Sequence, residues 1–376
     1  MAGDPELYIG LMSGTSLDAI DAVAVHFTEP GHSNQATLVA TLEKAFPDKL
    51  HTAIQSLVIS PQTDLDSLGR LHRQLGLVYA ETVQELLADN SIKNSAVRAI
   101  GCHGQTIRHS PDTTPAFTMQ IGDAATIANE CSIATVADFR SADMALGGEG
   151  APLVPAFHQW AFADPTADSV IANIGGIANI TVLAPGRPVA GFDTGPGNTL
   201  LDTWFRRNHD AAYDAGGQWA AGGSVLPDLL QLLESDPYFA RQSPKSTGRE
   251  YFNAEWLQQH LGRFAAADPQ NIQSTLAELS ARTIARAIGE HCERGAVWVC
   301  GGGSFNADLM NRLRTNLPEF TVADTSAKGV PPEWVEATAF AWLARERMHE
   351  RPAGMPDVTG ARTAGTLGAV HIPAIA

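Results

Sequence analysis

The chain of 376 residues carries 25 Lys and Arg against 41 Asp and Glu, a formal net charge of −16. This acidic balance, with no dense basic cluster, argues against a nucleic-acid partner. Hydrophobic residues at 44% and charged residues at 18% are typical of a folded protein, and the length predicts two or three domains. The 34 glycines exceed the roughly 26 that average usage predicts, so their placement needs an explanation.

The sequence patterns of export, membrane insertion and thiolate metal binding are not found. The first ten residues include Asp4 and Glu6 and no basic region, unlike a signal peptide. The longest uncharged run, 169–186, is interrupted by Asn, Gly and Pro, which makes it a poor membrane helix. The four cysteines lack CxxC spacing, so neither a zinc site nor a disulfide framework is indicated. We therefore expect a reduced, soluble, cytoplasmic protein without a membrane partner.

Patterns in the first half of the chain predict short strands and one long helix. Between residues 64 and 89, apolar residues recur at intervals of three and four, which indicates an amphipathic helix that begins at Thr63 or Asp64. Short apolar runs bounded by polar residues or glycine are typical of strands, and we expect strands at 8–12, 20–25, 97–100 and 133–136. The polar turn 13–16 joins the first two strands, so they should form a hairpin.

The second half opens with the same pattern. After the glycine-rich stretch 147–152, which predicts a domain boundary, the runs 170–174 and 177–183 again indicate a strand, a turn and a strand. Further elements are expected as a helix from about Leu200, a helix at 272–293, a strand at 296–300, a helix through Leu309 and Leu317, and a helix at 333–348. This alternation predicts an α/β protein whose halves, 1–150 and 151–376, follow one plan.

Four of the predicted strands end in glycine-containing turns. Such a turn exposes backbone N–H groups that can hold phosphate, and it lets the chain approach a ligand closely. A single turn of this kind is more often a simple connection, but recurrence at matching places favours a phosphate ligand. The turns are Ser13-Gly14-Thr15-Ser16, Gly175-Gly176, Asp193–Asn198 and Gly301-Gly302-Gly303. No P-loop, dinucleotide-binding or protein-kinase signature accompanies them.

These turns belong to longer motifs that are spread over essentially the whole chain. The motifs are GLMSGTSLD at 10–18, HGQT at 103–106, ADFR at 137–140, GAPLVP at 150–155, NIGG at 173–176, GFDTGPGN at 191–198, PKSTGRE at 244–250 and CGGG at 300–303. Together they resemble the motifs of the anhydro-N-acetylmuramic acid kinases, a family of the actin/sugar kinase/Hsp70 superfamily. Ala19 departs from the family, which usually has glycine after Ser-Leu-Asp; if that position needs a positive φ, alanine costs about 1 kcal/mol there.

The resemblance implies a two-domain, actin-like ATPase (ribonuclease-H-like) fold with a central interdomain cleft. Residues 1–150 would carry the first phosphate hairpin and part of the sugar site. Residues 151–376 would carry the second hairpin, the catalytic aspartate loop and the adenosine-side glycine loop, and residues 358–376 could pack back on the first half. Whether the protein is a homodimer stays open.

The implied activity is that of a sugar kinase, a phosphotransferase to an alcohol group that uses ATP and Mg²⁺. Its substrate would be 1,6-anhydro-N-acetylmuramic acid, and it would hydrolyse the anhydro ring in the same reaction, in peptidoglycan recycling and amino-sugar catabolism. The product would be N-acetylmuramic acid 6-phosphate. Another small-sugar kinase of the superfamily is the main alternative, and a non-catalytic actin-like ATP-binding protein is a weaker one.

Asp193 is the candidate catalytic residue. From the residues alone, a carboxylate before Gly-Pro-Gly suits a general base and an Asx turn that stabilises the loop about equally well. The resemblance favours the base, which would activate water for attack on the anomeric carbon. The released O6 would take the γ-phosphoryl group, a step that needs positioning and charge neutralisation.

The resemblance also implies two sets of binding residues. Those for ATP are Ser13, Gly14, Thr15, Ser16, Leu17, Asp18, Gly175, Gly176, Gly195, Gly301, Gly302 and Gly303. Those for the sugar are His103, Gln105, Asp138, Arg140, Glu149 and Glu336. Asp18 is the candidate Mg²⁺ ligand, the alternative being a solvated acid. A lactyl carboxylate needs a cation such as Arg140, although arginines more often form surface ion pairs, and Glu336 could simply favour a helix N-terminus.

Overall fold

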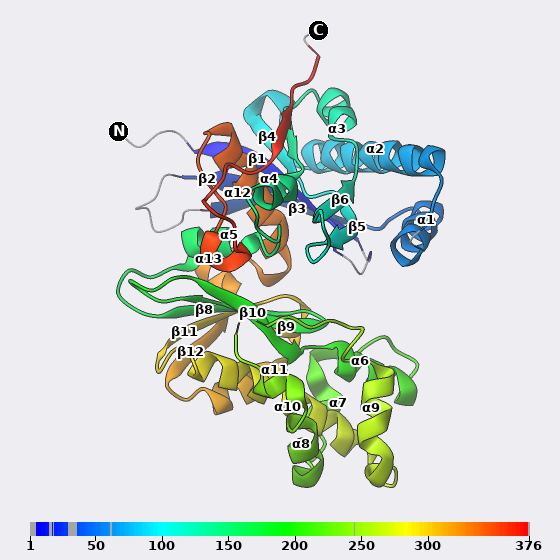
Figure 1. The fold of residues 1–376 in the computed structure, drawn as a ribbon, viewed down its shortest axis with the longest axis vertical. Helices are drawn as coiled ribbons and strands as arrows, with labels where there is room; N and C mark the ends of the chain where they lie inside the picture. Colours follow the sequence, from blue (N-terminus) through cyan, green and yellow to red (C-terminus); the bar gives the residue numbers. More distant parts are fainter. Residues whose placement is uncertain are drawn as a thin grey trace. The chain divides into compact units, whose positions relative to one another are not determined.

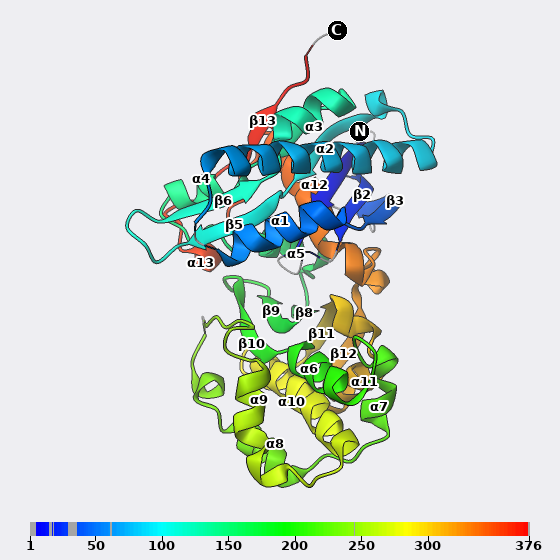
Figure 2. The same cartoon turned by 90° about the vertical axis from the view of Figure 1, so that its right-hand side faces the viewer.

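The computed structural model describes residues 5–14, 17, 19–28, 36–60, 62–243 and 245–374. These residues form an α/β protein (Figures 1 and 2) that divides into two compact units. The first unit comprises Met1–Ala161, Lys328–Val330 and Trp334–Ala376, and the second comprises Phe162–Ala327 and Pro331–Glu333. Within the described ranges, no helix is long and apolar enough to cross a membrane.

The first unit contains a mixed sheet, a two-stranded ribbon and surrounding helices. The strands of the sheet are β1 (Glu6–Met12), β2 (Ile20–Phe27), β3 (Ala36–Lys44), β4 (Val97–Cys102), β7 (Thr135–Ala137) and β13 (Ala369–His371). The ribbon pairs β5 (Gln105–Ser110) with β6 (Phe117–Ile121). The helices are α1 (Asp48–Ile59), α2 (Leu65–Asp89), the 3₁₀ helix η1 (Asn94–Ala96), α3 (Ala124–Cys131), α4 (Phe139–Ala145), α5 (Val154–Phe162), α12 (Val335–Met348) and α13 (Pro356–Thr359).

Successive side chains of β1 point to opposite faces of the sheet, and helices cover both faces. Leu7, Ile9 and Leu11 share a core with residues of α2 and α3. On the opposite face, Gly10 of β1 is the register partner of Gly101 of β4. A Cβ at these two positions would lie 1.9 Å and 2.0 Å from carbonyl oxygens of α12. The paired glycines therefore allow α12 to lie directly against the sheet.

The second unit contains one mixed sheet and a larger group of helices. Its strands are β8 (Ser169–Ile174), β9 (Ile177–Leu183), β10 (Ala190–Pro196), β11 (Gly295–Cys300) and β12 (Phe320–Asp324). Its α-helices are α6 (Thr199–Asn208), α7 (Gln218–Ala221), α8 (Pro227–Glu234), α9 (Ala254–Leu261), α10 (Pro269–Gly289) and α11 (Ala307–Asn316). The remaining 3₁₀ helices of the chain are η2 (Ala215–Gly217), η3 (Pro237–Ala240), η4 (Gly262–Phe264), η5 (Gly302–Phe305), η6 (Thr325–Lys328) and η7 (Pro332–Trp334).

Two hydrophobic cores organise the second unit. In the first, α10 and α11 pack against the sheet through β8, β9 and β11. In the second, residues of α6, α7, α8, α9 and the first half of α10 gather around η3, and α8 and α9 lie farthest from the sheet (Figure 1). Tyr238 and Phe239 of η3 contact Phe252 edge-on and stacked, respectively. This helical group matters for function because η3 contacts β10.

The two sheets repeat one topology. The strand order is β3-β2-β1-β4-β7 in the first unit, with β13 added beyond β7, and β10-β9-β8-β11-β12 in the second. In each unit the first three strands are antiparallel neighbours, and the last two are paired in parallel. This is the ribonuclease-H-like arrangement, present twice as in the actin-like ATPase fold. The expected fold class and the single plan of the two halves are confirmed.

Most expected elements are found with small shifts of their bounds. The helix expected from Thr63 or Asp64 is α2, and the carboxylate of Asp64 accepts a hydrogen bond from the N–H of Ser67, as an N-cap does. Ala19 is not among the described residues with positive φ, whereas Leu17, two positions earlier, has φ 58°. The conformational cost considered for alanine therefore does not arise at Ala19.

The structure divides the chain at different places from those expected. The stretch 147–152 lies inside the first unit, which continues to Ala161, because α5 packs there: Phe157 and Trp160 of α5 contact the ring of Trp342. The chain enters this unit again at Lys328–Val330 and then from Trp334 onward, before the expected residue 358, since α12 covers the sheet. Further on, β13 pairs antiparallel with β7.

Candidate functional site

Asp193 lies within strand β10 of the second unit rather than in a loop that follows a strand. The pairing of β10 with β9 shifts register between Asp193 and Gly195. Such a bulge turns side chains to new directions and is common beside active sites. Gly195 has φ 142°, and a Cβ there would lie 2.7 Å from the ring of Phe239. The bulge next to Asp193 therefore requires glycine.

The carboxylate of Asp193 has one oxygen held and one oxygen open. Its Oδ2 accepts hydrogen bonds from the backbone N–H of Thr247, at 3.0 Å, and from the hydroxyl of Ser246, at 3.1 Å. No described residue donates to Oδ1. Tyr238 donates its hydroxyl to the backbone oxygen of Asp193 at 2.6 Å. Burial raises the pKa of Asp193, and the two hydrogen bonds to Oδ2 partly offset that rise. A carboxylate of this kind is suited to take a proton from water.

The turn between β8 and β9 is tied to the start of α6. The N–H groups of residues 197–199 donate to the carbonyl oxygens of Gly175 and Gly176 at 2.8–3.0 Å. The guanidinium of Arg249 lies against the turn, since a Cβ at Gly176 would be 2.7 Å from its Nε. The N–H groups of residues 197–199 are therefore already bonded, and an anion at this turn would meet the cation of Arg249.

The three consecutive glycines after β11 have different roles. Gly301 has φ 77°, and a Cβ there would lie 2.4 Å from Oδ1 of Asn173. A Cβ at Gly303 would lie 2.3 Å from the side chain of Ile174. Packing against β8 thus requires both residues to be glycine. At Gly302 a Cβ would meet nothing closer than 3.9 Å, and this glycine lines a cavity of about 320 Å³.

This cavity combines exposed aromatic rings with a few polar groups. Tyr213 and Phe305 expose 62% and 59% of their surface, which offers flat apolar area to a base. Burial raises the pKa of Asp202 to about 6 against the attraction of Arg206 and Arg249. Apolar area with a few polar groups is typical of small-molecule sites. The lining residues are Asn198, Leu201, Asp202, Tyr213, Asp214, Gly216, Gly302, Phe305 and Asn306.

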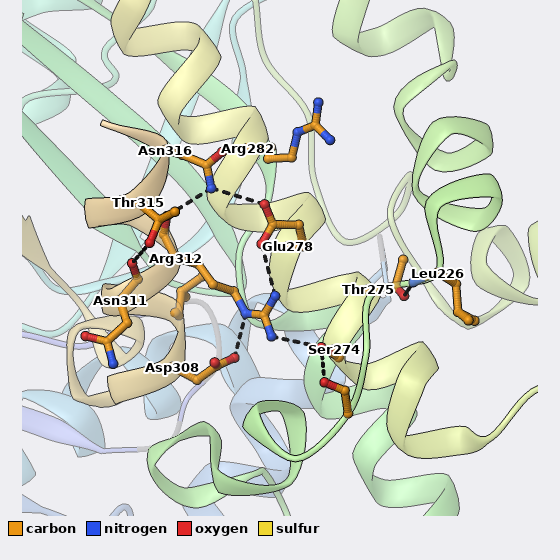
Figure 3. A network of polar contacts seen from close by, with 12 residues as sticks. Leu226, Ser274, Thr275, Glu278, Arg282, Asp308, Asn311, Arg312, Thr315 and Asn316 are labelled. Carbon is orange, nitrogen blue, oxygen red and sulfur yellow. Dashed lines mark hydrogen bonds and ion pairs between the residues drawn. The ribbon is translucent and has the colours of Figure 1, made fainter. Parts of the chain in front are cut away.

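A polar network around Arg312 fixes the helices that carry one wall of the cavity (Figure 3). Nε of Arg312 donates to Asp308 at 2.7 Å, while Nη1 and Nη2 donate to Glu278 at 3.0 Å and to Ser274 at 2.8 Å. The charged side chains are only 13–18% exposed. Asn306, the N-cap of α11, lines the cavity. The network therefore holds this wall in place by joining α11 to α10.

In the first unit, two residues expected to bind different ligands contact each other. The hydroxyl of Ser13 lies 2.7 Å from the hydroxyl of Tyr79 and donates to Oε1 of Gln105 at 2.9 Å. Ser13 and Gln105 are both buried. The N–H of Leu17 donates to the carbonyl of Gly14 at 3.2 Å, and the Leu17 side chain lies in the core. The other predicted residues of this loop lie outside the described ranges: Thr15, Ser16 and Asp18.

Arg140 and His103 form the polar centre of the expected sugar site. Nε and Nη2 of Arg140 lie 3.2 Å and 2.9 Å from Nε2 of His103, and Nη1 donates to the carbonyl of Gly150 at 2.8 Å. Burial and the nearby Arg140 hold the pKa of His103 well below its usual value, so Nε2 is an acceptor. Burial lowers the pKa of Arg140 to about 10, and the charge of Glu336 opposes this. A guanidinium has five N–H donors, so donors remain for a ligand.

Asp143, a residue that we did not predict, supports this centre. Its Oδ2 accepts from the N–H of Gly150 and its Oδ1 from the hydroxyl of Thr359, both at 2.8 Å. The N–H of Glu149 donates to the carbonyl of Thr359, also at 2.8 Å. A Cβ at Gly148 would lie 2.2 Å from Asp143 Oδ2. The loop that holds Arg140 through Gly150 is thus fixed by a carboxylate and by α13.

The remaining predicted sugar ligands are accessible. Asp138, Glu149 and Glu336 are exposed. Asp138 has φ 54° at the N-cap of α4, and its Oδ1 accepts from the hydroxyl of Ser141 at 2.5 Å. Glu336 lies in the first turn of α12. The structure therefore brings Arg140, His103 and Glu336 together, while Asp138 contacts its own helix start.

The described residues contain no group of three or more His, Cys, Asp or Glu side chains placed to hold a metal ion. The predicted ligand Asp18 lies outside those residues. Asp21 lies in β2, opposite Met12. A magnesium ion held mainly by ATP phosphates, with one or two carboxylates, needs no such group.

Several residues of the cavity and around Asp193 were not foreseen. Asp202 lies one helical turn after Asn198, so the helical period could have placed it on the same face. Tyr213 and Phe305 are aromatic residues in polar, glycine-rich segments of the sequence. This pattern could have indicated them as ligand-binding residues. Ser246 stands inside a recognised motif, but its contact with Asp193 joins residues 53 apart, and no local pattern reports such a contact.

Comparison with known proteins gives one consistent result. The family model described as anhydro-N-acetylmuramic acid kinase matches residues 6–373. An anhydro-N-acetylmuramic acid kinase of Shewanella amazonensis is 51% identical over 365 residues, which cover 96% of this chain and 98% of the relative. The enzyme of the same name from Shewanella frigidimarina is 50% identical over 367 residues, which cover 97% and 98%. A solved ROK family glucokinase from Streptomyces griseus, in complex with glucose and AMPPNP, aligns over 90% of this chain and 99% of that chain at 13% identity, with a TM-score of 0.38 that is too low for an argument.

Proposed function

Because the chain belongs to the anhydro-N-acetylmuramic acid kinase family, we propose that it converts 1,6-anhydro-N-acetylmuramic acid, ATP and water into N-acetylmuramic acid 6-phosphate and ADP. Water adds to the anomeric carbon, the bond from that carbon to O6 breaks, and O6 takes the γ-phosphoryl group. This reaction returns a peptidoglycan fragment to amino-sugar catabolism. Because the reaction uses ATP, we expect the protein to act in the cytoplasm.

The observation that carries this proposal is that one oxygen of the Asp193 carboxylate is held by hydrogen bonds while the other is open. With Oδ2 occupied by two donors and Oδ1 without a described partner, Asp193 would accept the proton of the attacking water on Oδ1. Burial raises its pKa, which strengthens it as a base. The proton taken from water is later released to solvent.

ATP would use residues of two glycine turns of the second unit, Gly175-Gly176 and Gly301-Gly302-Gly303. The adenosine would occupy the cavity beside Gly302, with its base against Tyr213 or Phe305 and its ribose hydroxyls near Asp202. The phosphates would meet the turn at Gly175-Gly176 and the guanidinium of Arg249. Bound Mg²⁺ would neutralise phosphate charge, and Asp18 remains the candidate residue to hold it.

The sugar would be recognised chiefly by residues of the first unit. Arg140, whose direction is fixed by His103 and Gly150, would bind the lactyl carboxylate in a charge-assisted pair. Gln105, Glu149 and Glu336 would contact the sugar hydroxyls and the N-acetyl group. In an acidic protein, an anionic sugar needs a cation of this kind.

The direct test is product analysis. The protein is incubated with MgATP and 1,6-anhydro-N-acetylmuramic acid in water enriched in ¹⁸O, and the products are analysed by mass spectrometry at early times. We expect a 6-phosphate with one ¹⁸O at the anomeric hydroxyl and none in the phosphate. A phosphorylated product that still contains the anhydro ring would show that phosphorylation is not coupled to hydrolysis of the ring. Phosphorylation of simple hexoses but not of the anhydro sugar would point to another sugar kinase of the superfamily.

A further inference from the structure

We propose that Ser246 is a positioning residue for the general base. Its hydroxyl, together with the backbone N–H of Thr247, holds Oδ2 of Asp193 and so keeps Oδ1 directed to the attacking water. This inference rests on the proposed role of Asp193. It adds a residue whose only contribution to the reaction is to fix the base.

The segment that contains Ser246 follows the backbone of β10. The N–H of Asp193 donates to the carbonyl of Lys245 at 3.1 Å, and the next two residues donate to the carboxylate of Asp193. Three consecutive residues thus contact one aspartate, through its backbone and its side chain. The hydroxyl is the only side-chain donor among these contacts. A serine here is therefore matched to the carboxylate rather than to the packing of the segment, since Ser246 itself is exposed.

The same segment continues to the candidate phosphate turn. Three residues after Ser246, the guanidinium of Arg249 lies against Gly176. One short stretch of chain thus contacts both the base and the turn expected to meet the phosphates of ATP. A shift of this stretch would change the direction of the Asp193 carboxylate. We therefore expect the hydroxyl of Ser246 to affect the rate of turnover more than the affinity for substrates.

The charged groups around Asp193 influence the pKa of its carboxyl, but they do not replace the hydrogen bond from Ser246 to Oδ2. Glu250, in the same segment, raises the pKa of Asp193. From η3, Tyr238 faces the aspartate and stays protonated, since burial and the charge of Asp193 raise its pKa. Lys245 and Arg241 lie over the ring of Tyr238, at 5.0 Å and 5.6 Å. Arg286 of α10 lowers the pKa of Lys245, and Glu290, which follows α10, raises it. Opposite Asp193 on β9 stands the neutral Asn179.

The test is the pH profile of kcat/KM for the sugar in the full-length protein, at saturating MgATP so that the titration of Asp202 does not enter the acidic limb. Loss of a hydrogen bond to the charged form raises the pKa of a carboxyl, so Ser246→Ala should move the acidic limb to higher pH by about half a unit to one unit. At pH 7 we expect kcat to fall about three- to tenfold, with KM for ATP and for the sugar within about twofold. Ser246→Thr retains the hydroxyl and should restore both the limb and the rate.

Two further variants separate this proposal from its premise. Ser243→Ala removes a hydroxyl from the same segment that faces His291 instead, and it should leave the profile unchanged. In an Asp193→Asn background, Ser246→Ala should have no further effect on the residual rate. An unshifted acidic limb in Ser246→Ala would overturn the positioning role even if Asp193→Asn is inactive. If Asp193→Asn is itself active, the premise fails first, and the pH limb belongs to another group.

Discussion

At the scale of single residues, the carboxylate of Asp193 combines a held oxygen, an open oxygen and a raised pKa. Asp193→Asn keeps the shape and replaces the base by an amide, so the bulge and the contact with Tyr238 should persist. We expect kcat to fall by about 10²–10⁴, with the dissociation constant for ATP unchanged. Steady-state ADP release and ATP titration by calorimetry measure the two quantities. A rate within tenfold of the parent would remove Asp193 from the base role.

A separate prediction concerns Asp202, because the ionised carboxylate that would favour nucleotide binding also lowers the stability of the folded protein. Its pKa of about 6 exceeds the value of about 4 in an unfolded chain, so the folded protein keeps this proton to higher pH. The carboxyl therefore lowers stability as the pH rises from about 4 to about 6, and it has its full cost above that window. Asp202→Asn should raise the free energy of unfolding by about 1–2 kcal/mol at pH 7.5 and by nearly nothing at pH 4.

The same substitution should weaken nucleotide binding. An ionised carboxylate accepts hydrogen bonds from ribose hydroxyls more strongly than an amide does, so KM for ATP should rise several-fold at pH 7.5. In the parent protein KM for ATP should rise as the pH falls below about 6, and in Asp202→Asn this dependence should be absent. Urea unfolding and initial rates at several pH values check both effects. An unchanged KM for ATP would place the ribose elsewhere.

At the scale of elements, the helices α10 and α11 act as one support because Arg312 joins them. Arg312→Met would leave the carboxylates of Asp308 and Glu278 mostly buried without their cation, which should cost about 2–4 kcal/mol of unfolding free energy. Since Asn306 at the start of α11 lines the cavity, KM for ATP should also rise. Urea unfolding and initial rates at varied ATP measure the two effects.

Arg282, on α10 like Glu278, provides the matched control (Figure 3). Its ion pair with Glu234, at 3.2 Å, is half exposed on the arginine side, and such pairs contribute less than about 1 kcal/mol. Arg282→Met should therefore change neither quantity measurably. An equal loss of stability in both variants would mean that Arg312 contributes through surface charge rather than through the buried network.

The elements also show which features the sequence could predict. Both hairpins, α2 and α10 were foreseen because a strand alternation or a helical period is a local signal. Strand β10 was taken for a loop because Asp193, Gly195 and Pro196 are poor strand formers, and the structure accommodates them through a bulge. The glycines at 301 and 303 were assigned to a ligand, whereas packing against β8 also requires them. Local patterns do not report such tertiary demands.

At the scale of the whole molecule, contacts distant in sequence complete the candidate site. Asp143 and Thr359 are 216 residues apart, and β13 reaches β7 from the other end of the chain. The resemblance placed Arg140 and Glu149 among the sugar ligands, but no spacing rule links them to a turn near the C-terminus. The chain thus uses its last elements to fix a loop of the first unit, and this arrangement can be tested separately from catalysis.

Thr359→Val keeps the volume of the side chain and removes the hydroxyl that donates to Asp143. The loop at 147–150 should lose part of its support, so Arg140 and Glu149 become less well placed for the sugar. We expect KM for the anhydro sugar to rise about five- to tenfold, while KM for ATP stays within twofold, as measured by initial rates with each substrate varied in turn. Thr82→Val is the matched control, because Thr82 is equally buried but donates to Val78 within α2. It should reduce stability without changing KM for the sugar, and a similar rise of KM in both variants would mean that Thr359 acts only through general stability of the first unit.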